Sequence, residues 1–310
     1  MVSDQFMSVM PLALDPSLFT FRDSGRPARW WVGIDGGGTS TRAVVADVAG
    51  RVLGRGEAGA SALNQGVDQA WRHIGEAIAQ AGVPGLQLAD CALGLGLSGT
   101  GVPAQRQAFV AADPGVARLA LTTDGFAGLL GAHGGRPGAL LISGTGSVAE
   151  ALLEDGSQRM TGGWGWQIGD EGSGAWLGQQ AMKLAQAAFD GRAPRGALAE
   201  SVYAATGRRR EDLLAFCAQA GQGGYASLAR LVFENAHDPA AAALLDAAAR
   251  ALDELAVALH PTLPLALAGS IALRLAPRLS PALQARRVEP QGDAAAGALW
   301  LIQQRETSLA

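Results

Sequence analysis

The chain has 310 residues, of which 48% are hydrophobic and 17% charged, and a formal net charge of −4. This composition is typical of a globular protein with room for two domains, and the small negative charge argues against nucleic acid or an anionic membrane as a partner. No apolar run is long enough to span a bilayer. The N-terminus lacks the basic start of a signal peptide, so residues 1–29 are predicted to be an extension outside the fold of a cytoplasmic protein.

The first predicted elements are a strand, a glycine turn and a second strand, over residues 30–48, WWVGIDGGGTSTRAVVADV. Three consecutive glycines remove every Cβ from the bend, so backbone N–H groups can approach a bound anion closely. Thr39 adds a hydroxyl, and Asp35 places a carboxylate at the end of the first strand. The turn lacks the lysine of a Walker loop and the helix of a Rossmann motif. The pattern therefore predicts a β-hairpin that holds phosphate, with an ordinary hairpin turn as the alternative.

The same unit recurs at residues 139–153, ALLISGTGSVAEALL, with Gly144, Thr145, Gly146 and Ser147 in the turn. The two turns are about one hundred residues apart, which is the size of one domain. We therefore predict two similar halves that each present a glycine turn to one cleft, where the turns hold the phosphates of a nucleotide from both sides.

Between the two turns, the pattern predicts a third strand at 51–60, followed by buried strands at 91–97 and 119–121 that alternate with helices at 67–81, 103–112 and 126–133. This alternation indicates a mainly parallel section, with ligands at the carboxyl ends of the strands. Asp124 lies at such an end, where it could also be a helix N-cap. Asn64 lies in the loop after the third strand, where an Asn most often bonds its own loop.

A long glycine-rich loop with tryptophans follows the second hairpin at residues 161–178, TGGWGWQIGDEGSGAWLG. Loops of this length are more often functional than connective. A tryptophan beside glycines can supply an apolar face for a sugar ring, while carboxylates such as Asp170 and Glu171 accept hydrogen bonds from vicinal hydroxyls. A packed loop with a solvated acidic pair is the alternative.

The C-terminal half is predicted to be mostly helical, with Ser173 and Asp238 as helix caps. A strand at 263–268 leads into a third glycine turn, where Gly269 and Ser270 suit contact with a ribose or a base. Val288 is expected to close a short final strand. The last helix, at 292–303, is rich in small residues, which let helix and sheet backbones approach closely, as a hinge between domains needs.

In this order, the segments GIDGGGTS, TTDG, ISGTGS, GGWG…GDEGSG and AGSIA resemble the amino-sugar kinases, that is, the N-acetylglucosamine kinase and glucosamine kinase family of the BadF/BadG/BcrA/BcrD ATPase type. The resemblance covers residues 30–303. This family is part of the superfamily of acetate and sugar kinases, heat-shock chaperones and actin, so the resemblance implies an α/β fold of two ribonuclease H-like lobes, a duplicated actin-like ATPase fold with a nucleotide cleft between the lobes. The lobes would span 30–138 and 139–304, the second with a helical insertion and with the last helix at the interdomain hinge.

The resemblance also implies roles for single residues. Asp124 would be the catalytic carboxylate next to the sugar 6-hydroxyl, and Asp35 would hold Mg²⁺. The sugar-binding residues would be Asn64, Asp124, Gly163, Trp164, Gly165 and Asp170. The residues that contact ATP would be Gly37, Gly38, Thr39, Gly144, Thr145, Gly146, Gly269 and Ser270.

The implied function is ATP-dependent phosphorylation of the 6-hydroxyl of N-acetylglucosamine. Glucosamine is the alternative substrate, because no residue that reads the substituent at C2 is identified. A homodimer is expected by the same resemblance. An ATPase that activates a 2-hydroxyacyl-CoA dehydratase is less favoured, because such proteins usually hold an iron–sulfur cluster across a dimer, whereas Cys91 starts a buried strand and Cys217 lies in a helix. A sugar sensor without catalysis would require loss of the Asp124 carboxylate.

Overall fold

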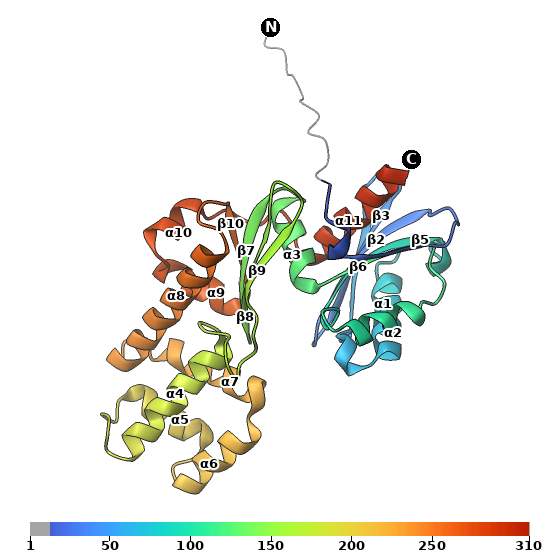
Figure 1. The fold of residues 1–310 in the computed structure, drawn as a ribbon. Helices are drawn as coiled ribbons and strands as arrows, with labels where there is room; N and C mark the ends of the chain where they lie inside the picture. The colour runs from blue at the N-terminus through green and yellow to red at the C-terminus, as the bar shows by residue number, and fades with distance from the viewer. Residues whose placement is uncertain (1–12, 310) are drawn as a thin grey trace. The chain divides into compact units, whose positions relative to one another are not determined.

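A computed structural model describes residues 13–309, with side chains described up to residue 304 (Figure 1). The contacts divide this part of the chain into two units. Unit 1 contains the described residues up to 138, residues 152–158 and the residues from 290 onward. Unit 2 contains residues 139–151 and 159–289. Both units are mixed α/β and each is built on one sheet, so the predicted α/β class with two sheet-based units is confirmed.

Unit 1 is built on a six-stranded sheet in the order β1-β6-β5-β2-β3-β4. The strands are β1 (Thr20–Asp23), β2 (Trp30–Gly36), β3 (Thr41–Asp47), β4 (Val52–Ala58), β5 (Cys91–Leu97) and β6 (Arg118–Thr122). Strands β2, β5 and β6 are parallel, whereas β3 and β4, the second strand of the hairpin and the predicted third strand, pair antiparallel. The carboxyl ends of the three parallel strands therefore meet at one edge of the sheet, which is where a ligand site is expected.

Strand β1 differs from the sequence-based expectation that residues 1–29 lie outside the fold. It pairs antiparallel with β6, with Thr20 opposite Leu121, so its backbone groups are satisfied by a strand about one hundred residues away. Residues 1–12 lie outside the described part of the chain.

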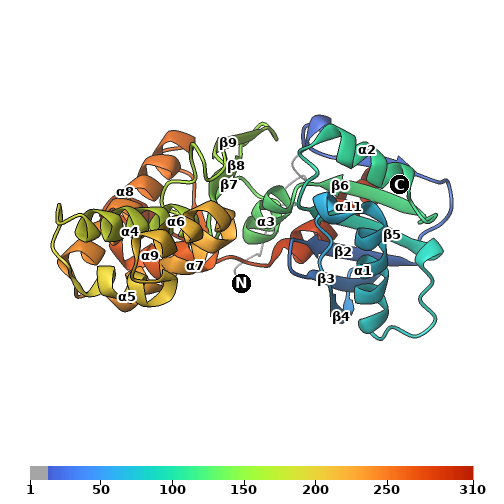
Figure 2. The same cartoon turned by 90° about the horizontal axis from the view of Figure 1, so that it is seen from below.

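The strand register assigns each helix of unit 1 to a face of the sheet (Figures 1 and 2). On one face, α1 (Val67–Gln80) and α2 (Pro103–Ala111) cover alternate residues such as Val32 and Leu93. Trp71 of α1 stacks on Phe109 of α2 with ring centroids 4.3 Å apart, and its indole N–H donates to the Phe109 carbonyl at 3.1 Å. Both side chains belong to the hydrophobic core of unit 1.

On the opposite face, α11 (Ala294–Leu309) and α3 (Asp124–His133) approach the sheet closely, because glycines face them. A Cβ on Gly33 would lie 2.0 Å from the Ala295 carbonyl oxygen, and a Cβ on Gly94 would lie 1.8 Å from that of Ala298. These contacts place α11 in unit 1, whereas the sequence grouped residues up to 304 with the second lobe. The small residues of α11 thus serve close helix–sheet packing within unit 1.

Unit 2 is built on a four-stranded sheet in the order β10-β7-β8-β9. The strands are β7 (Gly138–Ser143), β8 (Ser147–Leu152), β9 (Gln158–Gly162) and β10 (Leu265–Ala268), with β7 and β10 parallel. Strand β9 was not predicted, because the hairpin was expected to end at residue 153 and a loop was expected from residue 161. The final strand expected at Val288 is reduced to an isolated parallel bridge between Arg287 and Leu265, in which the Val288 N–H donates to the Leu265 carbonyl at 2.9 Å.

The rest of unit 2 is helical, as predicted. The helices are α4 (Gly174–Phe189), α5 (Ala197–Thr206), α6 (Arg210–Gln219), α7 (Gly221–Glu234), α8 (Pro239–Leu259), α9 (Ser270–Leu275) and α10 (Pro281–Arg286). Ser173 caps α4 and Asp238 caps α8, each by accepting from a backbone N–H in the first turn. No helix in the described residues is long and apolar enough to cross a membrane.

Candidate functional site

The first glycine turn joins β2 to β3 in unit 1, and its carbonyl groups accept hydrogen bonds from the loop that follows β4. The Gly37 carbonyl accepts from the N–H groups of Ser61 and Ala62, both at 3.1 Å, and the Gly38 carbonyl accepts from Gln65 Nε2 at 3.0 Å. No hydrogen bond within the described residues engages the N–H groups of Gly38 or Thr39. Fixed carbonyls with unengaged N–H groups make a cradle for an anion.

The loop that contains Asn64 lies directly against this turn. Gly36 makes the approach possible, because a Cβ there would lie 2.2 Å from the Ser61 hydroxyl oxygen. Asn64 lies in a short 3-10 helix, Leu63–Gln65, with an exposed side chain. Among the described residues its side chain has no hydrogen-bond partner, so the expected bond to its own loop is not formed and the amide is available to a ligand.

Asp124 is the first residue of α3, at the carboxyl edge of the unit 1 sheet. The N-cap is Thr123, whose hydroxyl accepts from the Phe126 N–H at 3.0 Å, so the capping role considered for Asp124 is taken by its neighbour. Asp124 is accessible to solvent, yet the surrounding protein desolvates its carboxyl and raises the pKa, while hydrogen bonds from Gly125 and Ser98 oppose that rise. The Asp124 carboxyl therefore accepts hydrogen bonds from the protein and is also accessible to solvent.

Asp35 lies at the end of β2, on the same edge of the sheet as Asp124. Burial raises the pKa of Asp35 to about 6, and the nearby carboxylates of Asp124 and Asp293 add to the rise. Arg42 opposes it from 3.8 Å, measured between Nη1 and Asp35 Oδ2. A half-buried carboxylate whose negative charge is only partly balanced by Arg42 favours the binding of a cation.

These carboxylates fit a magnesium ion that is shared with a phosphate ligand. The described residues contain no cluster of three or more His, Cys, Asp or Glu side chains able to hold a metal alone. Mg²⁺ is usually bound by one or two carboxylates together with substrate phosphates and water. Asp35 supplies a carboxylate oxygen ligand beside a glycine turn with unengaged N–H groups, and this arrangement matches that set of magnesium ligands.

The second glycine turn joins β7 to β8 in unit 2, and α4 holds its carbonyls. The Gly144 carbonyl accepts from the Gly174 N–H at 2.8 Å, and the Thr145 carbonyl accepts from the Ala175 N–H at 3.1 Å. In the part of the chain that the structure describes, the N–H groups of Thr145 and Gly146 donate to no protein acceptor. Both glycine turns therefore follow one plan, although their carbonyls are held by different elements.

The aromatic loop after β9 is fastened to this second turn. The Gly163 N–H donates to the Ser147 carbonyl at 3.0 Å, and the hydroxyl of Ser147 donates to the Glu171 carbonyl at 2.8 Å. Within the loop, Gly165 is half-buried, whereas Trp164 has 75% of its surface exposed. The exposed ring of Trp164 leaves an apolar face available to a ligand.

Asp170 has a different environment from the solvated acidic residue considered as the alternative. It is 4% exposed, and at φ +56° it is the non-glycine residue with positive φ among the described residues. Its carboxylate accepts from the backbone N–H groups of Ser147 and Gly165. Burial raises the pKa of Asp170, and these donors oppose the rise.

The third glycine turn lies beside the second one in unit 2. Gly269 has φ +86°, and a Cβ on it would lie 2.2 Å from the Ser143 carbonyl oxygen, so only glycine fits. Ser270 then begins α9 with an exposed side chain. The structure thus gathers two sets of predicted residues. The unit 1 set is Asp35, Gly37, Gly38, Thr39, Asn64 and Asp124. The unit 2 set is Gly144, Thr145, Gly146, Gly163, Trp164, Gly165, Asp170, Gly269 and Ser270.

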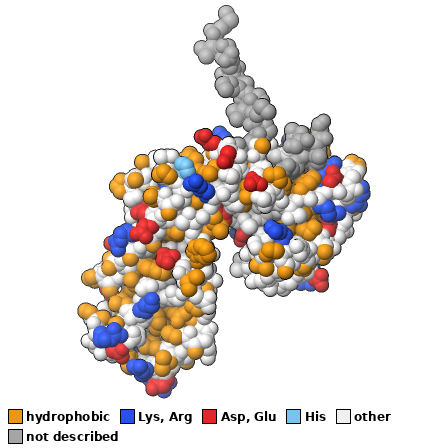
Figure 3. Space-filling view, in the orientation of Figure 1, with side chains coloured by type: hydrophobic (Ala, Val, Ile, Leu, Met, Phe, Trp, Pro, Cys, Tyr) orange, Lys and Arg blue, Asp and Glu red, His pale blue; other side chains and the backbone are white. Residues whose placement is uncertain are grey.

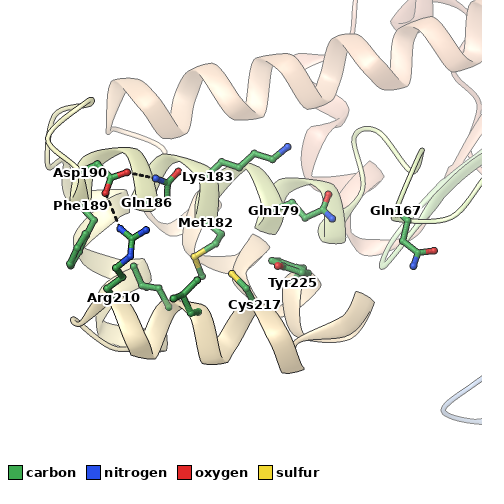
Figure 4. A pocket seen from close by; sticks show the side chains of 12 residues that line it. Gln167, Gln179, Met182, Lys183, Gln186, Phe189, Asp190, Arg210, Cys217 and Tyr225 are labelled. Atoms are coloured by element: carbon green, nitrogen blue, oxygen red, sulfur yellow. Dashed lines mark hydrogen bonds and ion pairs between the residues drawn. The ribbon is translucent and has the colours of Figure 1, made fainter.

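A separate groove of about 370 Å³ lies among the helices of unit 2 (Figure 4). Met182, Leu213 and Tyr225 are among its lining, and hydrophobic side chains gather over this helical region in Figure 3. None of the predicted site residues lines it. It reaches the aromatic loop at Gln167, which lines the groove together with Tyr225 of α7. The Tyr225 ring lies 5.8 Å from that of Trp166 in the loop.

Two residues that contact the predicted site were not identified from the sequence as functional. Ser98 lowers the pKa of Asp124 by hydrogen bonding, and its place after a buried strand was a usable signal. Gln222 of α7 donates to Asp170 Oδ2 at 3.1 Å. No local pattern marks Gln222, because it is fifty-two residues from its partner.

Comparison with known proteins finds relatives that match over most of the chain. The chain is 34% identical over 288 residues to a glucosamine kinase from Vibrio cholerae, covering 90% of this chain and 98% of that protein. It is 27% identical over 251 residues to an N-acetyl-D-glucosamine kinase from Dictyostelium discoideum, covering 73% and 77%. A crystal structure from Chromobacterium violaceum, provisionally assigned as an N-acetylglucosamine kinase, superposes with a TM-score of 0.83 at 44% identity, covering 89% and 99%.

The family assignment follows from the match over most of the chain. Residues 32–301 match the profile of the BadF/BadG/BcrA/BcrD ATPase family. That range begins in β2 and ends in α11, so it contains both glycine turns and the aromatic loop. The chain belongs to the BadF/BadG/BcrA/BcrD ATPase family.

Proposed function

We propose that this protein is an ATP-dependent amino-sugar kinase that phosphorylates the 6-hydroxyl of N-acetylglucosamine or glucosamine. The observation that carries the proposal is the pair of glycine turns whose carbonyls are engaged by the protein and whose inner N–H groups are not. The glucosamine kinase of Vibrio cholerae, which matches over 98% of its own length, supports the same reaction class.

Phosphoryl transfer needs positioned groups and neutralised charge more than covalent help from the protein. We assign phosphate contacts to Gly37, Gly38 and Thr39 in unit 1 and to Gly144, Thr145 and Gly146 in unit 2. Gly269 and Ser270, next to the second turn, are assigned to the adenosine. The unengaged N–H groups of Gly38, Thr39, Thr145 and Gly146 are fixed before the ligand arrives, so they need little reorganisation during the reaction. The N–H groups of Gly37 and Gly144 donate within their own turns.

The Asp124 carboxylate is assigned as the base that accepts the proton of the sugar 6-hydroxyl. A positioned general base typically contributes 10²–10⁴-fold to the rate. Its raised pKa makes the carboxylate a better proton acceptor than a carboxylate with the ordinary aspartate pKa. Ser98 would keep the carboxylate oriented through its hydrogen bond.

Asp35 is assigned to Mg²⁺, which supplies charge neutralisation on phosphate oxygens when bound. The pKa of about 6 leaves Asp35 largely ionised at neutral pH, and a nearby cation would lower that pKa further. Asn64, Gly163, Trp164, Gly165 and Asp170 are assigned to the sugar, with Trp164 as the apolar face for the ring.

The choice between the two sugars and the assembly state belong to the same proposal. The relatives include both a glucosamine kinase and an N-acetyl-D-glucosamine kinase, so both substrates are kept. A homodimer in the cytoplasm stays a prediction from the family resemblance.

The rival function, an ATPase activator of a 2-hydroxyacyl-CoA dehydratase, lacks support from the cysteines. Burial raises the pKa of Cys91 to about 12, which disfavours the thiolate that a cluster needs. Cys217 lies in α6 of unit 2, with its sulfur near Tyr225.

The test is an ADP-release assay with purified protein, ATP and Mg²⁺, run with glucosamine, N-acetylglucosamine, glucose and N-acetylmannosamine. We expect turnover with glucosamine, N-acetylglucosamine or both, at a kcat/KM at least tenfold above that for glucose. NMR of the product should show the phosphate at position 6. ATP hydrolysis that is independent of every sugar, together with iron in the purified protein, would contradict the proposal.

A further inference from the structure

We propose that Gln222 is a positioning residue that locks the aromatic loop onto the second glycine turn by holding the Asp170 carboxylate. This inference rests on the proposed function for its kinetic consequence, because Asp170 and the loop are assigned to the sugar. The lock itself is a property of unit 2 and does not depend on that assignment.

Asp170 has unusually strict requirements for its position. The residue is 4% exposed and has a left-handed backbone at φ +56°, a conformation that costs an aspartate roughly 1 kcal/mol or more. A Cβ on Gly146 would lie 2.6 Å from Asp170 Oδ2, so the carboxylate fills the space that glycine leaves. Backbone strain of this kind persists only where several contacts determine it.

The charge of Asp170 is satisfied by dipoles rather than by a cation. No salt bridge in the described residues includes Asp170. Its donors are the backbone N–H groups of Ser147 and Gly165 and the Gln222 side-chain amide, at 3.1 Å from Oδ2. Because a buried carboxylate without enough donors is unfavourable, loss of one donor out of three should release the carboxylate.

The three donors come from three elements that the lock joins. Ser147 begins β8 directly after the phosphate turn, Gly165 lies in the aromatic loop, and Gln222 lies in the first turn of α7. The other two donors are main-chain groups, which no substitution removes cleanly. Of the three donors to Asp170, Gln222 is therefore the one that a side-chain substitution can remove.

The same stretch of α7 supports the loop through a ring contact. Tyr225, three residues after Gln222, lies against Trp166 of the loop at 5.8 Å and against Phe216 of α6 at 5.9 Å. Figure 4 shows Tyr225 and Gln167 at the end of the groove nearest the loop. The aromatic loop is thus held at two points by α7, one polar and one apolar.

The experiment compares variants at position 222 that separate hydrogen-bond donation from shape. Gln222→Glu keeps the shape, removes the donor and adds a like charge. Gln222→Lys changes the shape and keeps a donor, and Gln222→Ala removes both. The matched control is Gln219→Glu, at an exposed position in α6.

For the sugar KM, we expect rises of roughly tenfold or more in Gln222→Glu and Gln222→Ala, the scale for a lost hydrogen bond to a charged group. Gln222→Lys should stay within about threefold of wild type, as should kcat and the ATP KM in all variants. A packing role gives the opposite order, with Gln222→Glu close to wild type and Gln222→Lys the most affected.

A second measurement does not depend on activity. Hydrogen exchange of peptides covering residues 163–172, without substrate, should be faster in Gln222→Glu and Gln222→Ala but not in Gln222→Lys or Gln219→Glu. Unchanged exchange in Gln222→Glu and Gln222→Ala overturns the lock. Faster exchange in a protein whose wild type phosphorylates no amino sugar would retain the lock and remove the proposed function.

Discussion

A Cβ on Gly146 would lie 2.6 Å from the Oδ2 atom of Asp170, so the second glycine turn and the aromatic loop can occupy their positions only if residue 146 is glycine. Asp170 is buried and held by three donors, so its carboxylate cannot simply swing away. The geometry of the aromatic loop therefore depends on the absence of a side chain at residue 146, about twenty residues earlier in the chain.

Gly146→Ala should therefore lower the stability of the protein. Because the added methyl group meets a fixed carboxylate, we expect a loss of roughly 1–3 kcal/mol in the free energy of unfolding, the usual cost of overpacking. Urea denaturation followed by circular dichroism would measure it. Gly144→Ala is the matched control, since a Cβ at residue 144 meets nothing within 4 Å; equal losses in the two variants would contradict the contact.

Asp124→Asn should remove turnover and leave sugar binding in place. The amide keeps the size of the side chain but cannot accept a proton, so kcat should fall by roughly 10²-fold or more, while calorimetry should give a sugar Kd within about threefold of wild type. In the wild type, kcat should fall on the acidic side, at a pH above the ordinary aspartate value, because the pKa of Asp124 is raised. Asp68→Asn, at an exposed position in α1, is the control. If Asp124→Asn turns over normally, Asp124 is not the base.

Asp35 should make the protein less stable as the pH rises. The folded-state pKa of about 6 lies above the ordinary aspartate value of 3.8, so between these values the folded protein retains a proton that the unfolded chain has lost. Stability falls through this window and levels off above pH 6, by roughly 3 kcal/mol if the whole shift is realised.

Asp35→Asn should therefore be more stable than wild type at pH 7.5 in EDTA, with the difference vanishing near pH 4. The same variant should be inactive, because it removes the carboxylate assigned to Mg²⁺. Chemical denaturation at the two pH values measures the effect. If the stability difference between Asp35→Asn and wild type is the same at pH 7.5 and at pH 4, the ionised Asp35 carboxylate does not destabilise the folded state.

Gly94→Ala should disrupt the packing of α11 on the unit 1 sheet. The added Cβ would lie 1.8 Å from the Ala298 carbonyl oxygen, and neither backbone can yield without moving the helix. We expect a loss of roughly 3 kcal/mol or more, or failure to obtain folded protein. Gly75→Ala in α1 is the control, because a Cβ there meets nothing within 4 Å and alanine favours a helix by up to about 1 kcal/mol. Similar thermal midpoints for the two variants would contradict this packing.

The sequence predicted the elements whose signals are local. Runs of β-prone residues around three glycines gave the first hairpin, and the Gly-Thr-Gly-Ser run gave the second. Ser173 and Asp238 were recognised as helix caps because a cap residue lies next to the helix that it serves. Asp124 was placed at a strand end, but its neighbour Thr123 was not recognised as the cap, since both residue types suit that position.

Contacts between distant segments were decided only by the tertiary structure. Strand β1 joins the sheet through β6, and α11 packs on β2 and β5 through glycines more than two hundred residues earlier in the chain. The sequence marked Asp170 as a carboxylate for a ligand, whereas folding also surrounds it with Ser147, Gly165 and Gln222. A residue pattern reports the preferences of a few neighbouring residues, but burial and hydrogen bonding depend on which remote backbones and side chains fill the surrounding space.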